Sequence, residues 1–222
     1  MKNNSIDVIA IDGPAGSGKS TTARLVAEKL DFTYLDTGAM YRALTLKALR
    51  KGLDLNKETE VLSLLKETSI ELHVDKRGLH ITLDDEDVTQ KIRTQKVTRH
   101  VSTIAAYPGV RKWMVQLQRE MGKKVKVVAE GRDIGTVVFP DARLKIFLVA
   151  SLEQRAKRRQ KDFSVKKKVD LKKIAEDIEK RDRIDSNRAA SPLIKADDAI
   201  ELDTTELTIE QQVDFVVKKW IS

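Results

Sequence analysis

The chain has no cysteine and few aromatic residues: its 222 residues include no Cys, two Trp, three Tyr and five Phe. The absence of thiols excludes disulfide frameworks, cysteine nucleophiles and cysteine-bound zinc, and it suits a reducing compartment. Few aromatic rings leave few platforms on which single-stranded nucleic acid could stack its bases. The 41% hydrophobic content is nevertheless well above that of disordered chains, so we expect a folded protein.

Long hydrophobic runs are also missing. The longest, such as the run at 146–150, span five or six residues, far below the roughly 20 residues that cross a bilayer. Residues 1–7 lack the apolar core of a secretory signal. From these absences we expect a cytoplasmic protein without membrane contact.

The charge of the chain is unbalanced, because 42 Lys and Arg face 34 Asp and Glu, for a net charge of +8. This excess predicts an anionic partner, either nucleic acid or a small phosphate compound. Residues 153–168 concentrate it, with eight Lys or Arg and two acids. Such a run is commonly a solvated helix face or, less often, a nucleic-acid surface. The position of this basic run relative to the other motifs distinguishes these possibilities.

Apolar periodicity alternates between short strand-like runs and longer helical stretches, which is typical of a parallel sheet covered by helices. The strand-like runs are 6–11, 33–35, 125–129, 145–149 and 199–202. We therefore predict an α/β fold with a five-stranded parallel sheet flanked by helices. No internal repeat or low-complexity linker divides residues 1–222, which favours a single domain with insertions.

Residues 55–91 interrupt this alternation and are expected to form a small antiparallel β insert. Two apolar runs of period two flank a loop at 75–78, namely Ile70, Leu72 and Val74, then Leu79, Ile81 and Leu83. This spacing predicts a hairpin in which Leu72 faces Ile81 and the apolar side chains share one face. His73 would then face His80, and two histidines without a forced third ligand favour a solvated pair over a metal site.

A glycine-rich segment directly follows the first predicted strand. The segment comprises Gly13, Pro14, Ala15, Gly16, Ser17, Gly18, Lys19, Ser20 and Thr21. It matches G-x-x-x-x-G-K-[ST] between a strand and a helix, which predicts a loop that binds nucleotide phosphates. Backbone N–H groups converge on phosphate oxygens there, and the helix N-terminus adds its positive dipole end. Lys19 would neutralise the β- and γ-phosphates, and the Ser20 hydroxyl would bind Mg²⁺.

Two further segments place charged residues at the ends of predicted strands. Residues 35–42 include Asp36, Tyr41 and Arg42, and Thr37 is expected to be the N-cap of the helix that follows. Residues 129–136 form a second charged cluster. The carboxyl ends of parallel strands open into one crevice, where ligands bind. In that crevice Asp36 would hold the water shell of Mg²⁺, and Tyr41 and Arg42 would meet a second phosphate.

With these motifs the chain resembles the bacterial cytidylate kinases, P-loop enzymes of the nucleoside-monophosphate kinase group, over essentially its whole length. The resemblance rests on segments 11–20, 35–42, 86–89, 131–142 and 185–193, in this order. It implies transfer of the γ-phosphoryl group of ATP to CMP or dCMP in pyrimidine metabolism, by a monomer. It also implies a monophosphate-binding insert at about 55–91 and a short basic lid at about 153–170. Glu130 departs from the family pattern, where Asp is expected.

The resemblance also implies the roles of individual residues. Those that would bind CMP are Thr37, Tyr41, Arg42, Ser102, Arg111, Gly131, Arg132, Asp133, Arg181, Asp185 and Arg188. Those that would act on the transferred phosphoryl group are Lys19, Arg132, Arg155, Arg158 and Arg181, with Arg159 beside them in the lid. Ser102, Arg111 and Asp133 would read the base, since the N4 donor of cytosine suits a carboxylate and its acceptors suit a guanidinium. Uracil would set its O4 acceptor against Asp133 and be disfavoured.

The residues leave two alternatives open. One is a P-loop kinase for another small acceptor, such as a different nucleoside monophosphate. The other, less favoured, is a basic nucleic-acid-binding NTPase, whose affinity for DNA or RNA would fall with salt. The kinase interpretation needs no general base. A phosphate monoester has a second pKa of about 6, so the attacking oxygen of the acceptor is already ionised at neutral pH.

Overall fold

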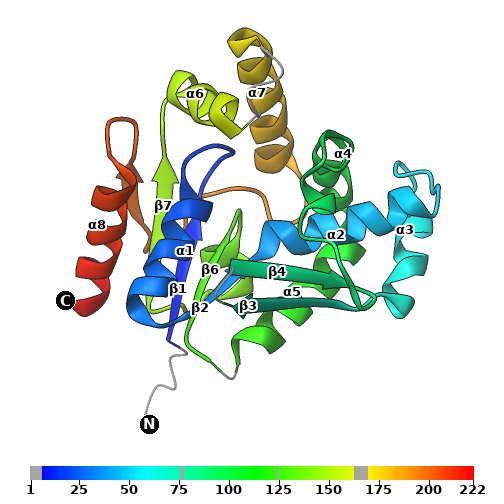
Figure 1. Cartoon of the computed structure of the whole chain (residues 1–222), viewed down its shortest axis with the longest axis horizontal. Coiled ribbons are helices and arrows are strands. Elements are labelled where there is room, and N and C mark those ends of the chain that lie inside the picture. The colour runs from blue at the N-terminus through cyan, green and yellow to red at the C-terminus, as the bar shows by residue number, and fades with distance from the viewer. Residues whose placement is uncertain (1–6, 76–77, 124, 163–169) are drawn as a thin grey trace.

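The structure is a computed structural model and describes residues 7–75, 78–123, 125–162 and 170–222 (Figure 1). Its centre is a parallel five-stranded sheet with the strand order β2-β6-β1-β7-β8. The strands are β1 (Val8–Asp12), β2 (Thr33–Asp36), β6 (Val127–Gly131), β7 (Leu144–Val149) and β8 (Ile200–Asp203). The predicted α/β fold and its five strands are therefore confirmed. The first strand begins at Val8, and Ile6 lies outside the described residues.

Helices cover both faces of this sheet. They are α1 (Lys19–Leu30) and α8 (Ile209–Ile221) on one face, and α2 (Thr37–Arg50), α4 (Gln95–Ala106) and α5 (Pro108–Gly122) on the other. Alternate residues of β1 serve the two layers: Ile9 and Ile11 pack with α1 and α8, whereas Val8 and Ala10 pack with the other helices. The whole of β1 is buried, which explains why its sequence is continuously apolar up to Asp12.

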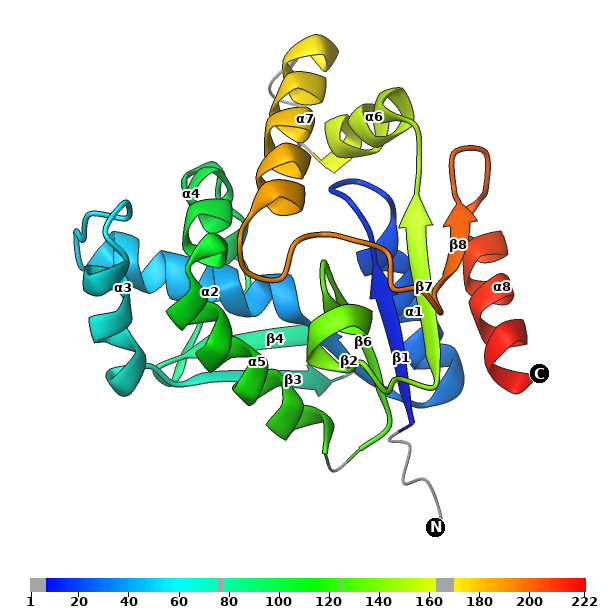
Figure 2. The ribbon, with the colours of Figure 1, turned by 180° about the vertical axis from the view of Figure 1, so that it is seen from behind.

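The remaining helical elements are α3 (Glu58–Leu64), α6 (Leu152–Asp162), α7 (Leu171–Asn187), the short 3₁₀ turns η1 (Leu65–Glu67) and η2 (Lys91–Arg93), and the π-helix η3 (Ile134–Val138). Helices α6 and α7 lie side by side beyond the carboxyl ends of the strands, in the views from the front and from behind (Figures 1 and 2). The predicted lid, at about 153–170, coincides with α6 and ends at Asp170, the N-cap residue of α7, and its residues 163–169 lie outside the described part of the chain. Among the described helices, none has the length and apolarity to span a bilayer.

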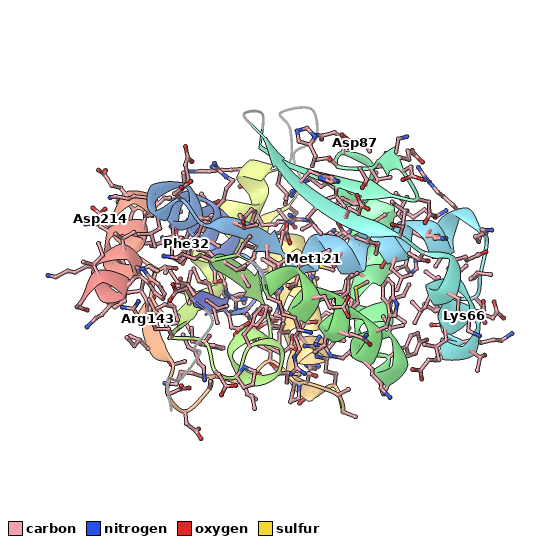
Figure 3. All side chains as sticks on the ribbon, turned by 90° about the horizontal axis from the view of Figure 1, so that it is seen from below. Phe32, Lys66, Asp87, Met121, Arg143 and Asp214 are labelled. Atoms are coloured by element: carbon pink, nitrogen blue, oxygen red, sulfur yellow. The ribbon has the colours of Figure 1, made fainter. Side chains whose placement is uncertain are left out.

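The predicted antiparallel hairpin is confirmed, in the predicted register. Strands β3 (Ile70–Asp75) and β4 (Gly78–Leu83) pair with Leu72 opposite Ile81, and β5 (Glu86–Asp87) adds a short third strand that the periodicity did not indicate. The buried side chain of Ile81 joins the core beneath α2. Figure 3 shows this sheet with Asp87 on its outer side, where the carboxylate lies 3.2 Å from a ring nitrogen of His80.

Candidate active site

The glycine-rich segment forms a tight loop between β1 and α1, and two of its glycines are sterically required. A Cβ atom on Gly13, whose φ is +151°, would lie 2.2 Å from the carbonyl oxygen of Leu148 in β7. Gly18 has φ +97°, and a Cβ there would lie 3.0 Å from Oε1 of Gln212 in α8. The loop therefore approaches two other elements as closely as a bare backbone allows.

Lys19 is the first residue of α1 and is buried, with 6% of its surface exposed. Its Nζ donates to the carbonyl oxygen of Pro14 at 3.0 Å. Burial, and after it the positive charge of Arg132, lowers the pKa of Lys19 to about 7. A buried amine that faces arginines is stabilised by any anion that enters between them. Ser20 and Thr21 follow on the same helix turn and are exposed.

A pocket lies beside this loop, between α2, α4, α5, α7 and the segment that follows β6. Its lining comprises Thr37, Gly38, Tyr41, Val101, Ser102, Ala105, Arg111, Gly131, Arg132, Asp133, Arg181, Asp185 and Arg188. Ten of the eleven residues predicted to bind CMP are among them. Sequence reasoning missed the other three, Gly38, Val101 and Ala105. Val101 and Ala105 lie one helical turn apart on α4, on either side of Ser102 along the chain, and that periodicity could have pointed to them.

Asp133 is the acidic residue of this pocket whose buried carboxylate faces Arg111 and Arg188. It forms an ion pair with Arg111, and Nη2 of Arg188 lies 3.5 Å from its Oδ1. Arg111 is itself 3% exposed and donates to the carbonyl oxygen of Ala105 at 3.1 Å. Its guanidinium carbon lies 5.4 Å from the ring centre of Tyr41. Two of the three residues predicted to read the base, Arg111 and Asp133, thus meet in one buried cluster, and the third, Ser102, lines the same pocket.

A second buried carboxylate, Asp185, organises the arginines on the side of the phosphate loop. Nε of Arg132 donates to its Oδ2 at 2.9 Å, and Nε of Arg181 lies 3.8 Å from the same oxygen. Burial, and after it the nearby Arg132, lowers the pKa of Arg181 to about 9. Two guanidinium groups therefore share one carboxylate, which leaves positive charge for an incoming phosphate. Arg188 is the C-cap residue of α7 and directly follows the last helical residue, Asn187.

Arg42 is the predicted CMP-binding residue that does not line this pocket. Its Nη1 donates to Oγ1 of Thr98 at 2.8 Å and is 3.4 Å from the carbonyl oxygen of Ile92. Burial lowers the pKa of Arg42 to about 10. Its guanidinium is thus engaged with α4 and the turn before it.

Two arginines of α6, Arg155 and Arg158, contact the phosphate loop. Nη1 of Arg155 donates to the carbonyl oxygen of Ala15 at 3.1 Å and also pairs with Asp182, whose Oδ1 accepts the N–H of Ala15 at 3.0 Å. Nη1 of Arg158 donates to the carbonyl oxygen of Ser17 at 3.2 Å and to Oγ1 of Thr204 at 3.0 Å. No local motif pointed to Asp182 or Thr204, because each acts on a loop more than 160 positions away.

Two acids stand side by side at the ends of β2 and β6, where Asp36 pairs with Glu130 in the sheet register. Burial, and after it the charge of Glu130, raises the pKa of Asp36 to about 6. The Glu130 carboxylate accepts the hydroxyl of Tyr34 at 2.6 Å, a contact that sequence reasoning missed. The charge of Glu130 also acts on Lys19 of the phosphate loop, where it favours the protonated amine.

The expectation that Thr37 caps α2 is wrong. Asp36 is the N-cap, and its Oδ1 accepts the N–H of Ala39 at 2.8 Å. Thr37 is the first helical residue, and its hydroxyl donates instead to the carbonyl oxygen of Glu130 at 2.7 Å. The strand pairing explains the difference, because it brings the Glu130 carbonyl within reach of the threonine hydroxyl.

Comparison with known proteins agrees with this geometry. The family model for cytidylate kinase matches residues 9–221. The cytidylate kinase of Bacillus pumilus is 54% identical over 204 residues, covering 91% of each chain. That of Clostridioides difficile is 50% identical and covers 96% of this chain and 97% of its own.

Among solved structures, an uncharacterised protein from Eubacterium ventriosum superimposes with a TM-score of 0.51 at 14% identity, over 97% of this chain and 98% of that one, which bears on the fold alone. The matched family model and the half-identical, full-length relatives decide the question of kinship. The chain belongs to the cytidylate kinase family, a group of nucleoside-monophosphate kinases.

Proposed function

We propose that this chain transfers the γ-phosphoryl group of ATP to CMP or dCMP, giving ADP and CDP or dCDP. The observation that carries the proposal is the pocket beside the phosphate loop, in which Asp133 is held between Arg111 and Arg188. A carboxylate next to guanidinium donors complements the N4 donor and the N3 and O2 acceptors of cytosine.

In this pocket Thr37, Tyr41, Arg132, Arg181 and Asp185 hold the phosphate and sugar of CMP. The acceptor oxygen is already ionised at neutral pH, so the transfer needs no general base. Catalysis then consists of bringing the two phosphates in line and stabilising charge on the transferred group. Lys19, Arg132 and Arg181 do this. Burial, and after it the charge of Arg132, lowers the pKa of Lys19 and of Arg181, and a nucleotide phosphate entering between these cations would stabilise their charged forms.

The residues present fit a magnesium ion bound together with ATP. Mg²⁺ prefers hard oxygen ligands and keeps several waters, with one or two carboxylates and the substrate phosphates. The exposed hydroxyl of Ser20 and the adjacent carboxylates of Asp36 and Glu130 supply such oxygens. In our proposal Ser20 binds the ion directly and Asp36 orders its waters. The bound ion supplies charge neutralisation at the β- and γ-phosphates.

Arg155 and Arg158 also belong to this proposal, as lid residues that act on the transferred group. Their guanidinium groups hold the carbonyl oxygens of Ala15 and Ser17. Each therefore acts directly on the phosphoryl group only after that bond to the loop is broken. We further propose that the enzyme works as a monomer in the cytoplasm. The cysteine-free composition supports the reducing compartment in this proposal.

The test is an acceptor panel. Purified protein is given ATP and Mg²⁺ with CMP, dCMP, UMP or AMP, and ADP release is measured. Rapid turnover with CMP or dCMP, slower turnover with UMP and little with AMP are expected. A preference for another monophosphate would support a kinase for a different acceptor, and stimulation by DNA or RNA alone would support a nucleic-acid-dependent NTPase.

A further inference from the structure

Asp12, the last residue of β1, carries a buried carboxylate that the proposed chemistry does not use. Its side chain is 5% exposed, and both of its oxygens accept backbone hydrogen bonds. Oδ1 accepts the N–H of Ile134 and Oδ2 accepts the N–H of Gly135, each at 2.8 Å. One carboxylate thus binds the first two residues of the π-helix η3 (Ile134–Val138) from the end of the neighbouring strand, since β1 pairs with β6.

These two residues directly follow Asp133, whose backbone is therefore held from both sides. The carbonyl oxygen of Asp133 accepts the N–H groups of Val137 at 2.9 Å and Val138 at 3.1 Å. The N–H groups next along the chain are taken by Asp12. Short π-helical turns are rare and occur frequently at functional sites. The backbone on the C-terminal side of Asp133 is thus held by a carboxylate from the strand that leads into the phosphate loop.

We propose that Asp12 is a positioning residue that aims the base-reading carboxylate of Asp133 at the acceptor nucleotide. This inference rests on the proposed function, since it presupposes that Asp133 reads cytosine. Asp12 also directly precedes Gly13, so it ties the loop that binds the donor to the residue that selects the acceptor.

A carboxylate suits this position because both of its oxygens accept. Asn keeps one acceptor but turns an NH₂ donor toward the second backbone N–H, which leaves that N–H without a partner. A lost hydrogen bond to a charged group corresponds to about a tenfold or larger change in an equilibrium. In Asp12→Asn we therefore expect the KM for CMP to rise about tenfold and the preference for CMP over UMP to fall by a similar factor.

A merely structural role predicts a different pattern. Because Asp12 adjoins the phosphate loop, general loosening would raise the KM for ATP at least as much as the KM for CMP. In Asp12→Asn we expect the KM for ATP to stay within about threefold of the wild-type value. That change is smaller than the loss of one hydrogen bond to a charged group would cause. The matched control is Thr22→Val, which removes the 2.8 Å bond from the buried Thr22 hydroxyl to Gln212 on the donor side. This control should leave the preference for CMP over UMP unchanged.

The experiment measures KM and kcat for ATP, CMP and UMP in wild type, Asp12→Asn, Asp133→Asn and Thr22→Val. If wild type makes no CDP, the proposed function and this inference both fail. If Asp133→Asn loses the preference while Asp12→Asn keeps it, the positioning role alone is overturned, and the same holds if ATP and CMP are affected equally. Amide hydrogen exchange of the wild type gives a test that needs no variant: slow exchange at Ile134 and Gly135 is expected, and fast exchange at both would overturn the inference.

Discussion

Replacing Asp133 by Asn gives the sharpest test of base recognition, because it removes charge while keeping shape. The carboxylate is 5% exposed and faces Arg111 and Arg188. A hydrogen bond to a charged group contributes about 1.5–3 kcal/mol, which corresponds to roughly a 10- to 150-fold increase in the KM for CMP. The amide nitrogen of Asn can donate to O4 of uracil, so the preference for CMP over UMP should fall further than the affinity for CMP alone.

The assay is steady-state ADP release with CMP or UMP varied at saturating ATP, and then with ATP varied at saturating CMP. Breaking a buried ion pair can cost about 3–5 kcal/mol of stability, so urea unfolding of the variant is measured alongside. The matched control is Asp185→Asn, a second buried carboxylate paired with arginines in the same pocket. We expect this control to raise the KM for CMP and to leave the ratio of CMP to UMP turnover unchanged. Equal losses for CMP and ATP in Asp133→Asn would refute the base-reading role.

Three further outcomes are expected. Lys19→Ala should lower kcat roughly a thousandfold, since it removes the charge at the β- and γ-phosphates, while calorimetry should still detect CMP binding; near-normal turnover would contradict this. Gly13→Ala places a Cβ 2.2 Å from the Leu148 carbonyl oxygen, whereas Gly52→Ala, at φ +68°, meets open space. In urea unfolding, only Gly13→Ala should lose more unfolding free energy than the ~1 kcal/mol that left-handed backbone strain costs. Burial raises the pKa of Asp12 to about 6, above ~3.9 for an unfolded chain, so the folded state retains a proton in this window and stability falls as pH rises. Between pH 5 and 7 the wild type should lose about 1 kcal/mol more unfolding free energy than Asp12→Asn, and parallel pH profiles would show that Asp12 is not the group responsible.

The sequence alone determined the features that are encoded within a few consecutive residues. The phosphate loop is one, because its glycines, Lys19 and Ser20 stand next to each other and the following helix start is local. The hairpin register is another, since a period of two leaves one pairing that buries Leu72 and Ile81 on a single face. The five strands of the sheet are also encoded locally, because each is a short apolar run between helical stretches.

Only the tertiary structure decided which groups the long cationic side chains bind. Arg42 turns to Thr98, and Arg155 and Arg158 hold the phosphate loop, because a guanidinium on a flexible stem binds whichever oxygen the fold brings near it. The partners of Asp12 lie more than 120 positions away along the chain, and neither is a side chain. Backbone N–H groups carry no residue identity, so no reading of the sequence locates them until the strands are paired.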